Sequence, residues 1–154
     1  YKASKEKCNA LTDNAKDICV KEAKGHEDVA KAELEAQYKP STKAAYKARV
    51  ARADADYAIA KEKCDDLSGN AKDVCVKDAK AAHVAAKENA KVAQAQAKPA
   101  DTPAAKGAAV AEARKDASAE KNEANYKAAK ERCDTMQGDA KSKCVDDAKR
   151  IYGQ

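Results

Sequence analysis

Cysteine and histidine are the residues in this sequence whose chemistry could define a site, and every cysteine falls in one repeated pattern. The chain has 154 residues, with six cysteines and two histidines. A segment that begins with Tyr and holds two cysteines occurs three times, over Tyr1–Lys24, Tyr57–Lys80 and Tyr126–Lys149. The cysteines of the three copies are Cys8 and Cys19, Cys64 and Cys75, and Cys133 and Cys144.

Three kinds of chemistry use cysteines in pairs: redox exchange, zinc binding and structural disulfides. Ten residues separate the cysteines of each copy, a spacing that fits neither a redox CxxC motif nor a zinc knuckle. His26 follows Cys19 by seven residues and His83 follows Cys75 by eight, so no histidine recurs at a matching offset. We expect both histidines to be exposed on helices.

The repeated segment predicts two helices joined by a tight turn. Tyr57, Ala60, Cys64 and Leu67 follow the spacing that lines one face of a helix. After the turn, a stripe of small residues around Cys75 predicts a second helix that lies close to the first. Each cysteine then lies on an inward face about one turn from the connection.

This geometry favours one disulfide within each copy, although six cysteines allow fifteen pairings. The predicted pairs are Cys8 with Cys19, Cys64 with Cys75, and Cys133 with Cys144.

Signals at the turns set the expected helix boundaries. Asn14 and Asn70 are expected N-caps of the second helix in the first two copies, and Gly138 with Asp139 takes that place in the third. The expected helices reach from Ala15 to Tyr38, from Ser41 or Thr42 to Leu67, from Ala71 to Ala97, from the N-cap Thr102 and Pro103 to Met136, and from there to Tyr152, after a short first helix.

The predicted fold class is therefore all-α: three disulfide-stapled helical hairpins that form an elongated antiparallel array. The hairpins span residues 1–38, 42–97 and 104–152, with a linker at 98–103, in one repeat domain over 1–154. All three disulfide turns are expected at one end of the array and both proline turns at the other.

The composition predicts thin helix packing and no thick core. Of the residues counted as hydrophobic, 39 are alanine, against three Leu, three Ile, nine Val and one Met. Alanine is the best helix former, but its contacts bury little apolar surface. Disulfides are then expected to supply much of the stability.

Charge argues against nucleic acid as a partner. The net charge is +5, but 31 basic residues are interspersed with 26 acidic ones, and Phe and Trp are absent. A weak attraction to anionic surfaces is the most that we expect. The acidic pairs Asp65/Asp66 and Asp146/Asp147 should bind no metal specifically, because neighbouring carboxylates diverge around a helix. No cofactor is expected.

Persistent disulfides indicate the periplasm or the extracellular space. Tyr1 in place of an initiator Met is consistent with removal of a secretory signal, or with a fragment. No apolar run has the length of a transmembrane helix.

The phrases AKEKCDDLSGNAKDVCVKDAK, VAKAELEAQYKPS and AKERCDTMQGDAKSKCVDDAK resemble those of secreted, Ala/Lys-rich cysteine-repeat proteins of proteobacteria, often labelled TolA-like cell-envelope proteins. The resemblance covers most of the chain. It implies export to the periplasm or beyond and no known enzyme activity, and it carries over no catalytic or binding residue.

A structural or scaffold role in the cell envelope or extracellular space is the function that we expect. Cysteines held in disulfides cannot act as nucleophiles, so an enzyme is not expected. The two terminal helices are short, which predicts head-to-tail association into filaments through Tyr1, Ile151 and Tyr152. The alternative is a periplasmic binding or stress protein that captures partner proteins, metals or anionic polymers.

Overall fold

Ser41 and Thr102 mark two of the helix starts in the computed structural model, which describes residues 1–154. Ser41 Oγ accepts a hydrogen bond from the Ala44 backbone N–H at 3.0 Å, and Thr102 Oγ1 accepts one from Ala105 at 3.1 Å. Each cap satisfies a backbone donor that the first turn of a helix leaves free. Both caps confirm the sequence-based prediction.

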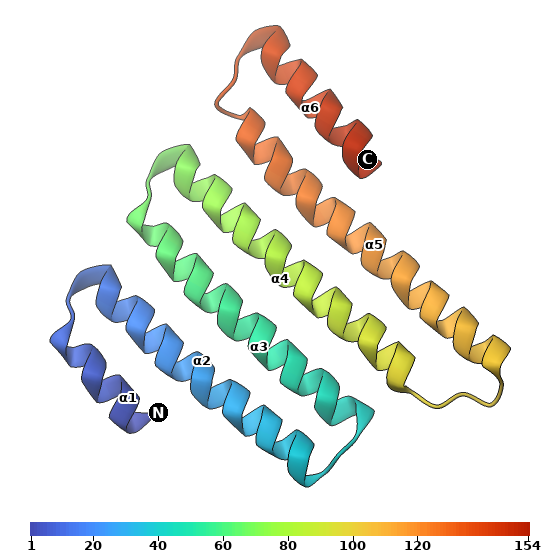
Figure 1. The fold of residues 1–154 in the computed structure, drawn as a ribbon. Coiled ribbons are helices and arrows are strands. Elements are labelled where there is room, and N and C mark those ends of the chain that lie inside the picture. The colour runs from blue at the N-terminus through green and yellow to red at the C-terminus, as the bar shows by residue number, and fades with distance from the viewer.

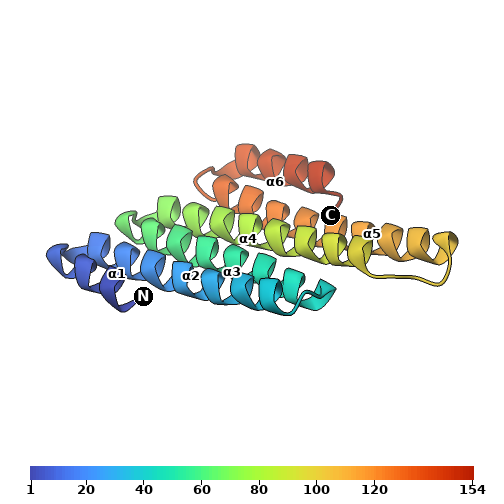
Figure 2. The ribbon, with the colours of Figure 1, turned by 60° about the horizontal axis from the view of Figure 1, so that its bottom comes forward.

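Six α-helices result, joined alternately by disulfide turns and proline turns. They are α1 (Lys2–Lys7), α2 (Asp13–Tyr38), α3 (Thr42–Lys63), α4 (Gly69–Ala97), α5 (Pro103–Cys133) and α6 (Gly138–Tyr152), with short 3₁₀ turns η1 (Cys8–Ala10) and η2 (Cys64–Asp66). The helices lie side by side in chain order in one layer (Figures 1 and 2). The disulfide turns gather at one end and the proline turns at the other, so the all-α array predicted from the sequence is confirmed.

The second helix of each hairpin begins differently from the prediction. Asp13, Gly69 and Gly138 occupy the same position in the three turns, and their φ angles are 50°, 56° and 58°. The helices start at these residues, so Asn14 and Asn70 lie inside the first turn and do not cap it. The predicted asparagine caps are therefore wrong, and so is the cap expected from Gly138 with Asp139, because α6 begins at Gly138 itself.

The first helix of each hairpin ends before the apolar residue that was expected on its inward face. α3 ends at Lys63, and Leu67 has an extended backbone with φ −101° and ψ 166°. Leu11, Leu67 and Met136 are 41%, 44% and 43% exposed. The predicted helical face does not include these residues, because the helix ends before them.

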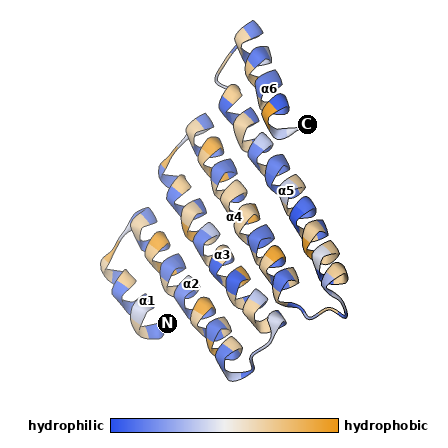
Figure 3. Cartoon of the chain, turned by 45° about the vertical axis from the view of Figure 1, so that its right-hand side comes forward, coloured by the Kyte–Doolittle hydropathy of each residue, from blue (hydrophilic) through white to orange (hydrophobic).

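The interior of the layer consists almost entirely of small residues. Only 13 residues are buried, and the largest fully buried side chains are Cys8, Cys64 and Cys133. Hydrophilic and hydrophobic residues alternate along every helix (Figure 3). The sulfur atoms thus take the place that large aliphatic side chains occupy in a thicker domain.

Packing runs between helices that are adjacent in the chain. At Gly25 of α2, an added Cβ atom would lie 2.8 Å from the Cβ atom of Ala55 in α3. Glycine and alanine therefore let α2 and α3 approach closely. Each hairpin contacts only the hairpin next to it, as in other repeat proteins.

Candidate functional site

The three disulfides form the predicted pairs within each hairpin. Cys8 bonds Cys19, Cys64 bonds Cys75 and Cys133 bonds Cys144, with Cα–Cα distances of 5.6, 5.6 and 5.8 Å. These distances lie in the middle of the usual range for a disulfide. No cysteine is free. The sulfurs therefore hold the two helices of each hairpin together and offer no thiol for catalysis.

An ion pair spans the disulfide turn in the second and third hairpins. Lys72 Nζ lies 2.8 Å from Asp65 Oδ1, and Lys141 Nζ lies 2.9 Å from Asp134 Oδ1. The hydrogen bond from Lys72 lowers the pKa of Asp65 below its usual range, and the same bond raises the pKa of Lys72. The first hairpin has Asn9 at the matching position and no such pair.

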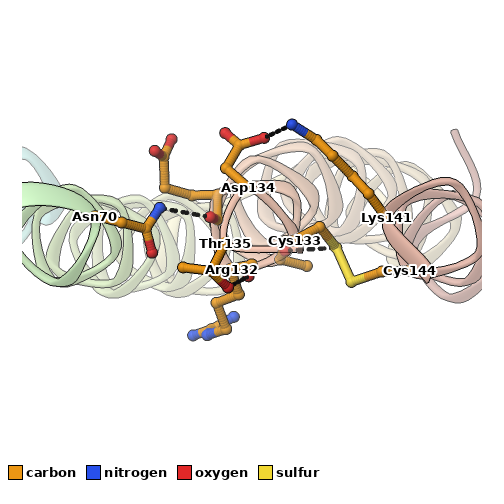
Figure 4. Close-up of a disulfide and its surroundings, with 9 residues drawn as sticks. Asn70, Arg132, Cys133, Asp134, Thr135, Lys141 and Cys144 are labelled. Carbon is orange, nitrogen blue, oxygen red and sulfur yellow. Dashed lines mark hydrogen bonds and ion pairs between the residues drawn. A yellow bond between two sulfur atoms is a disulfide. The ribbon is translucent and has the colours of Figure 1, made fainter. Parts of the chain in front are cut away.

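Two asparagines link neighbouring hairpins. Asn14 Nδ2 in α2 donates to the Glu62 backbone carbonyl in α3 at 3.0 Å, and Asn70 Nδ2 in α4 donates to the Glu131 carbonyl in α5 at 3.1 Å. Figure 4 shows Asn70 reaching toward α5 beside the disulfide of Cys133. Both acceptors lie two residues before the first cysteine of the next hairpin. These bonds fix the register between hairpins.

Sequence reasoning missed this role because Asn before a helix is also a common N-cap. One signal was available. The third copy has Asp139 where the others have Asn, and a carboxylate cannot donate the bond.

His83 is not exposed as predicted. Its ring stacks on Tyr57 with a centroid distance of 4.6 Å, and its Nε2 lies 2.5 Å from Asp54 Oδ1. The side chain is only 10% exposed. Tyr57 thus packs within its own hairpin. His26, by contrast, is exposed as expected. The prediction was wrong for His83 because it did not consider the Tyr57 ring of the facing helix α3.

The acidic pairs lie apart from one another and pair with basic residues. Asp65 pairs with Lys72, Asp147 Oδ1 lies 2.9 Å from Arg150, and Asp146 lies 3.8 Å from Lys149. No three His, Cys, Asp or Glu side chains gather as a metal site would require. Neighbouring cations thus pair with three of the four carboxylates, and Asp66 has no ion pair.

The three residues expected to support assembly lie within their own hairpins. Tyr1 is 45% exposed, and Lys5 and Lys24 place their Nζ atoms 5.9 and 5.7 Å from its ring centroid. Ile151 and Tyr152 line a groove of about 530 Å³ between α5 and α6, whose floor includes Cys133 and Cys144. Ile151 is 65% exposed. No contact with another molecule tests their predicted role.

No helix combines the length and apolar character that crossing a membrane requires. Comparison with known proteins adds no relative: no family model, curated protein or solved structure matches the chain. Chemically, the described geometry provides mechanical linkage: disulfides inside hairpins, and hydrogen bonds and ion pairs between them.

Proposed function

We propose that the protein is a structural or scaffold protein of the cell envelope or extracellular space. The observation that carries this proposal is the row of three disulfides at one end of a single helix layer, tied from hairpin to hairpin by Asn14 and Asn70. A rigid layer of this kind can keep the molecules that bind its two faces at a fixed distance from one another.

The dimensions and surface support this role. α5 has 31 residues, so it is about 46 Å long at 1.5 Å per residue. Ion pairs cover the surface, and several join one hairpin to the next, as Arg52 with Glu33 and Arg132 with Asp78 do. The chain gains a large surface from a small buried volume, which suits a spacer better than an enclosed reaction site.

The disulfides and the absence of a membrane-spanning helix are compatible with a secreted or periplasmic protein. Expression with and without a secretory signal in a bacterial host tests the compartment. Thiol trapping should find all six cysteines oxidised after export and reduced when the chain stays in the cytosol. A cytosolic product that is fully oxidised and equally stable would remove this support.

The scaffold role requires that the layer be rigid in solution. Ketone-bearing residues at the exposed positions Gln37 in α2 and Ala111 in α5 can carry nitroxide labels without using the cysteines. Pulsed electron resonance should give one narrow distance distribution for the oxidised protein and a broader one after reduction. A broad distribution in the oxidised protein would contradict the scaffold proposal.

The groove between α5 and α6 favours the second candidate, a binding protein. Met136 and Ile151 are 43% and 65% exposed at its rim, and most of its lining is apolar. A fluorescent apolar anion, anilinonaphthalene sulfonate, should bind there with a stoichiometry near one, and Ile151→Asp should weaken this binding. Ala82→Asp, at the matching exposed position of the second hairpin, is the control. Equal loss in both variants would contradict a groove-specific site.

A further inference from the structure

The second helix of each hairpin has an outward stripe, which we define as the positions that meet the following hairpin in α2 and α4, together with their counterparts in α6. The stripe consists of Asn14, Ile18 and Gly25 in α2, of Asn70, Val74 and Ala81 in α4, and of Asp139, Lys143 and Arg150 in α6. The repeat offsets that align the cysteines also align these positions. At 3.6 residues per turn, the three positions of each stripe lie within about 40° of one another around the helix.

In α2 and α4 the outward stripe is the surface that joins one hairpin to the next. The asparagine donates to a backbone carbonyl of the following hairpin, over 3.0 Å for Asn14 and 3.1 Å for Asn70. Ile18 and Val74 are half-buried one turn later. Gly25 and Ala81 are buried, and any side chain at Gly25 would collide with Ala55 of α3.

In α6 every position of the outward stripe carries a residue that opposes this kind of contact. Asp139 can only accept hydrogen bonds, so it would face a carbonyl oxygen without a proton to share. Lys143 replaces the aliphatic residue, and Arg150 replaces the glycine or alanine that permits close approach. All three side chains are exposed.

The ion pairs of α6 also differ from those of α4 in a way that disfavours contact with a further hairpin. In the second hairpin, Asp78 of α4 reaches across to Arg132 of α5. Asp147 is its counterpart in α6, and it instead bonds Arg150 within its own helix at 2.9 Å. The residue that links hairpins in the interior of the array is thus already satisfied at this edge.

We infer that the outer edge of α6 is closed to another hairpin of this repeat, including the α1 edge of a second copy. The outer face of α1 keeps the accepting residues, because Ala3 and Glu6 align with Ile59 and Glu62 of α3 and with Ala128 and Glu131 of α5. The helix that fits it bears an amide donor, an aliphatic residue four positions later and Gly or Ala eleven positions later. In this chain only α2 and α4 carry that stripe, and both are already covered.

This inference replaces the head-to-tail assembly expected from the sequence. Ile151 and Tyr152 lie toward α5, and the stripe that would meet a second copy is charged. The inference concerns one edge of the layer and holds for either role proposed above.

Sedimentation velocity of the 154-residue protein over a wide concentration range tests it. The wild type should remain monomeric. The triple variant Asp139→Asn, Lys143→Val and Arg150→Ala restores the stripe of α4 and should form concentration-dependent chains, with an association constant at least tenfold above that of the wild type. Adding Ala3→Arg on α1 should return the triple variant to monomer.

The control variant is Ser142→Val with Lys149→Ala. It removes polar groups from exposed positions of α6 outside the outward stripe, and it should stay monomeric. Circular dichroism and thiol titration establish that each variant keeps its helices and disulfides. Should the triple variant fold poorly, Lys143→Val alone should still raise the association constant measurably. Head-to-tail association of the wild type would overturn the inference. So would a folded triple variant that stays monomeric together with a monomeric Lys143→Val variant.

Discussion

The two ends of the helix layer are held together by different means. At the disulfide end, each hairpin has a covalent bond, and the turns of the second and third hairpins add an ion pair. At the proline end, the connections rely on the N-caps Ser41 and Thr102 and on alanine packing. Stability in this chain is therefore concentrated at the disulfide end, and the proline end should open first.

The largest effect should come from removing one staple. Replacing Cys64 and Cys75 together by Ala should lower the free energy of unfolding by about 3 kcal/mol, because a short closed loop then regains its freedom in the unfolded chain. Thermal unfolding followed by circular dichroism measures the change. If the melting temperature stays within a few degrees of the wild type, the disulfide end does not dominate stability.

The link between hairpins comes next in size. Asn70→Ala removes the hydrogen bond to the Glu131 carbonyl and should cost about 1 kcal/mol. Asp139→Asn is the matched control, because the same position in α6 has no partner and the change should leave monomer stability nearly unaltered. Equal losses in both variants would show that Asn70 acts within its own helix.

The proline end should respond to loss of a cap. Thr102→Ala removes the bond to the Ala105 N–H and should cost about 1 kcal/mol. Hydrogen exchange should speed up over the first turn of α5 and leave the disulfide turn of Cys133 unchanged. Faster exchange at both ends would mean that the two ends open together.

A smaller gain in stability should come from the first disulfide turn. Asp13 adopts a φ of 50° where the other two turns have glycine. Asp13→Gly should relieve this conformation and stabilise the protein by about 0.5 kcal/mol, after the flexibility that glycine gives the unfolded chain is counted. Chemical denaturation measures it. Gly69→Ala, the reverse change in the second turn, should destabilise.

The smallest effect is a dependence on pH. The pKa of Asp65 is lowered by its hydrogen bond with Lys72, so this contribution to stability is present above the carboxyl's unfolded pKa and disappears as pH falls through the lower folded value. The raised pKa of Lys72 gives a contribution that is present below its unfolded pKa and disappears as pH rises through the folded value. The free energies of unfolding of the wild type and of Asp65→Asn should differ by a constant amount around neutral pH. This difference should shrink at both acidic and alkaline extremes. A difference that varies between pH 6 and pH 8 would contradict this pair as the cause.

The sequence predicted the features that repeat and missed those that depend on a neighbouring helix. The three disulfides followed from cysteines that recur at one spacing, and the caps Ser41 and Thr102 followed from local chemistry. Asn70 and His83 were misassigned because their partners, Glu131 and Tyr57, lie on other helices. Local rules cannot reveal such partners until the register between helices is known.

Every disulfide joins cysteines that are consecutive in the sequence, and this has a consequence for how the chain matures. Each bridge spans eleven positions, and the helices pack against their neighbours along the chain. If the chain is exported N-terminus first, an oxidant that joins each new cysteine to the one before it forms the native bonds in order, with no wrong pair to undo. Short-range contacts also favour rapid folding. In such an export, each hairpin can close its disulfide before the cysteines of the next hairpin emerge.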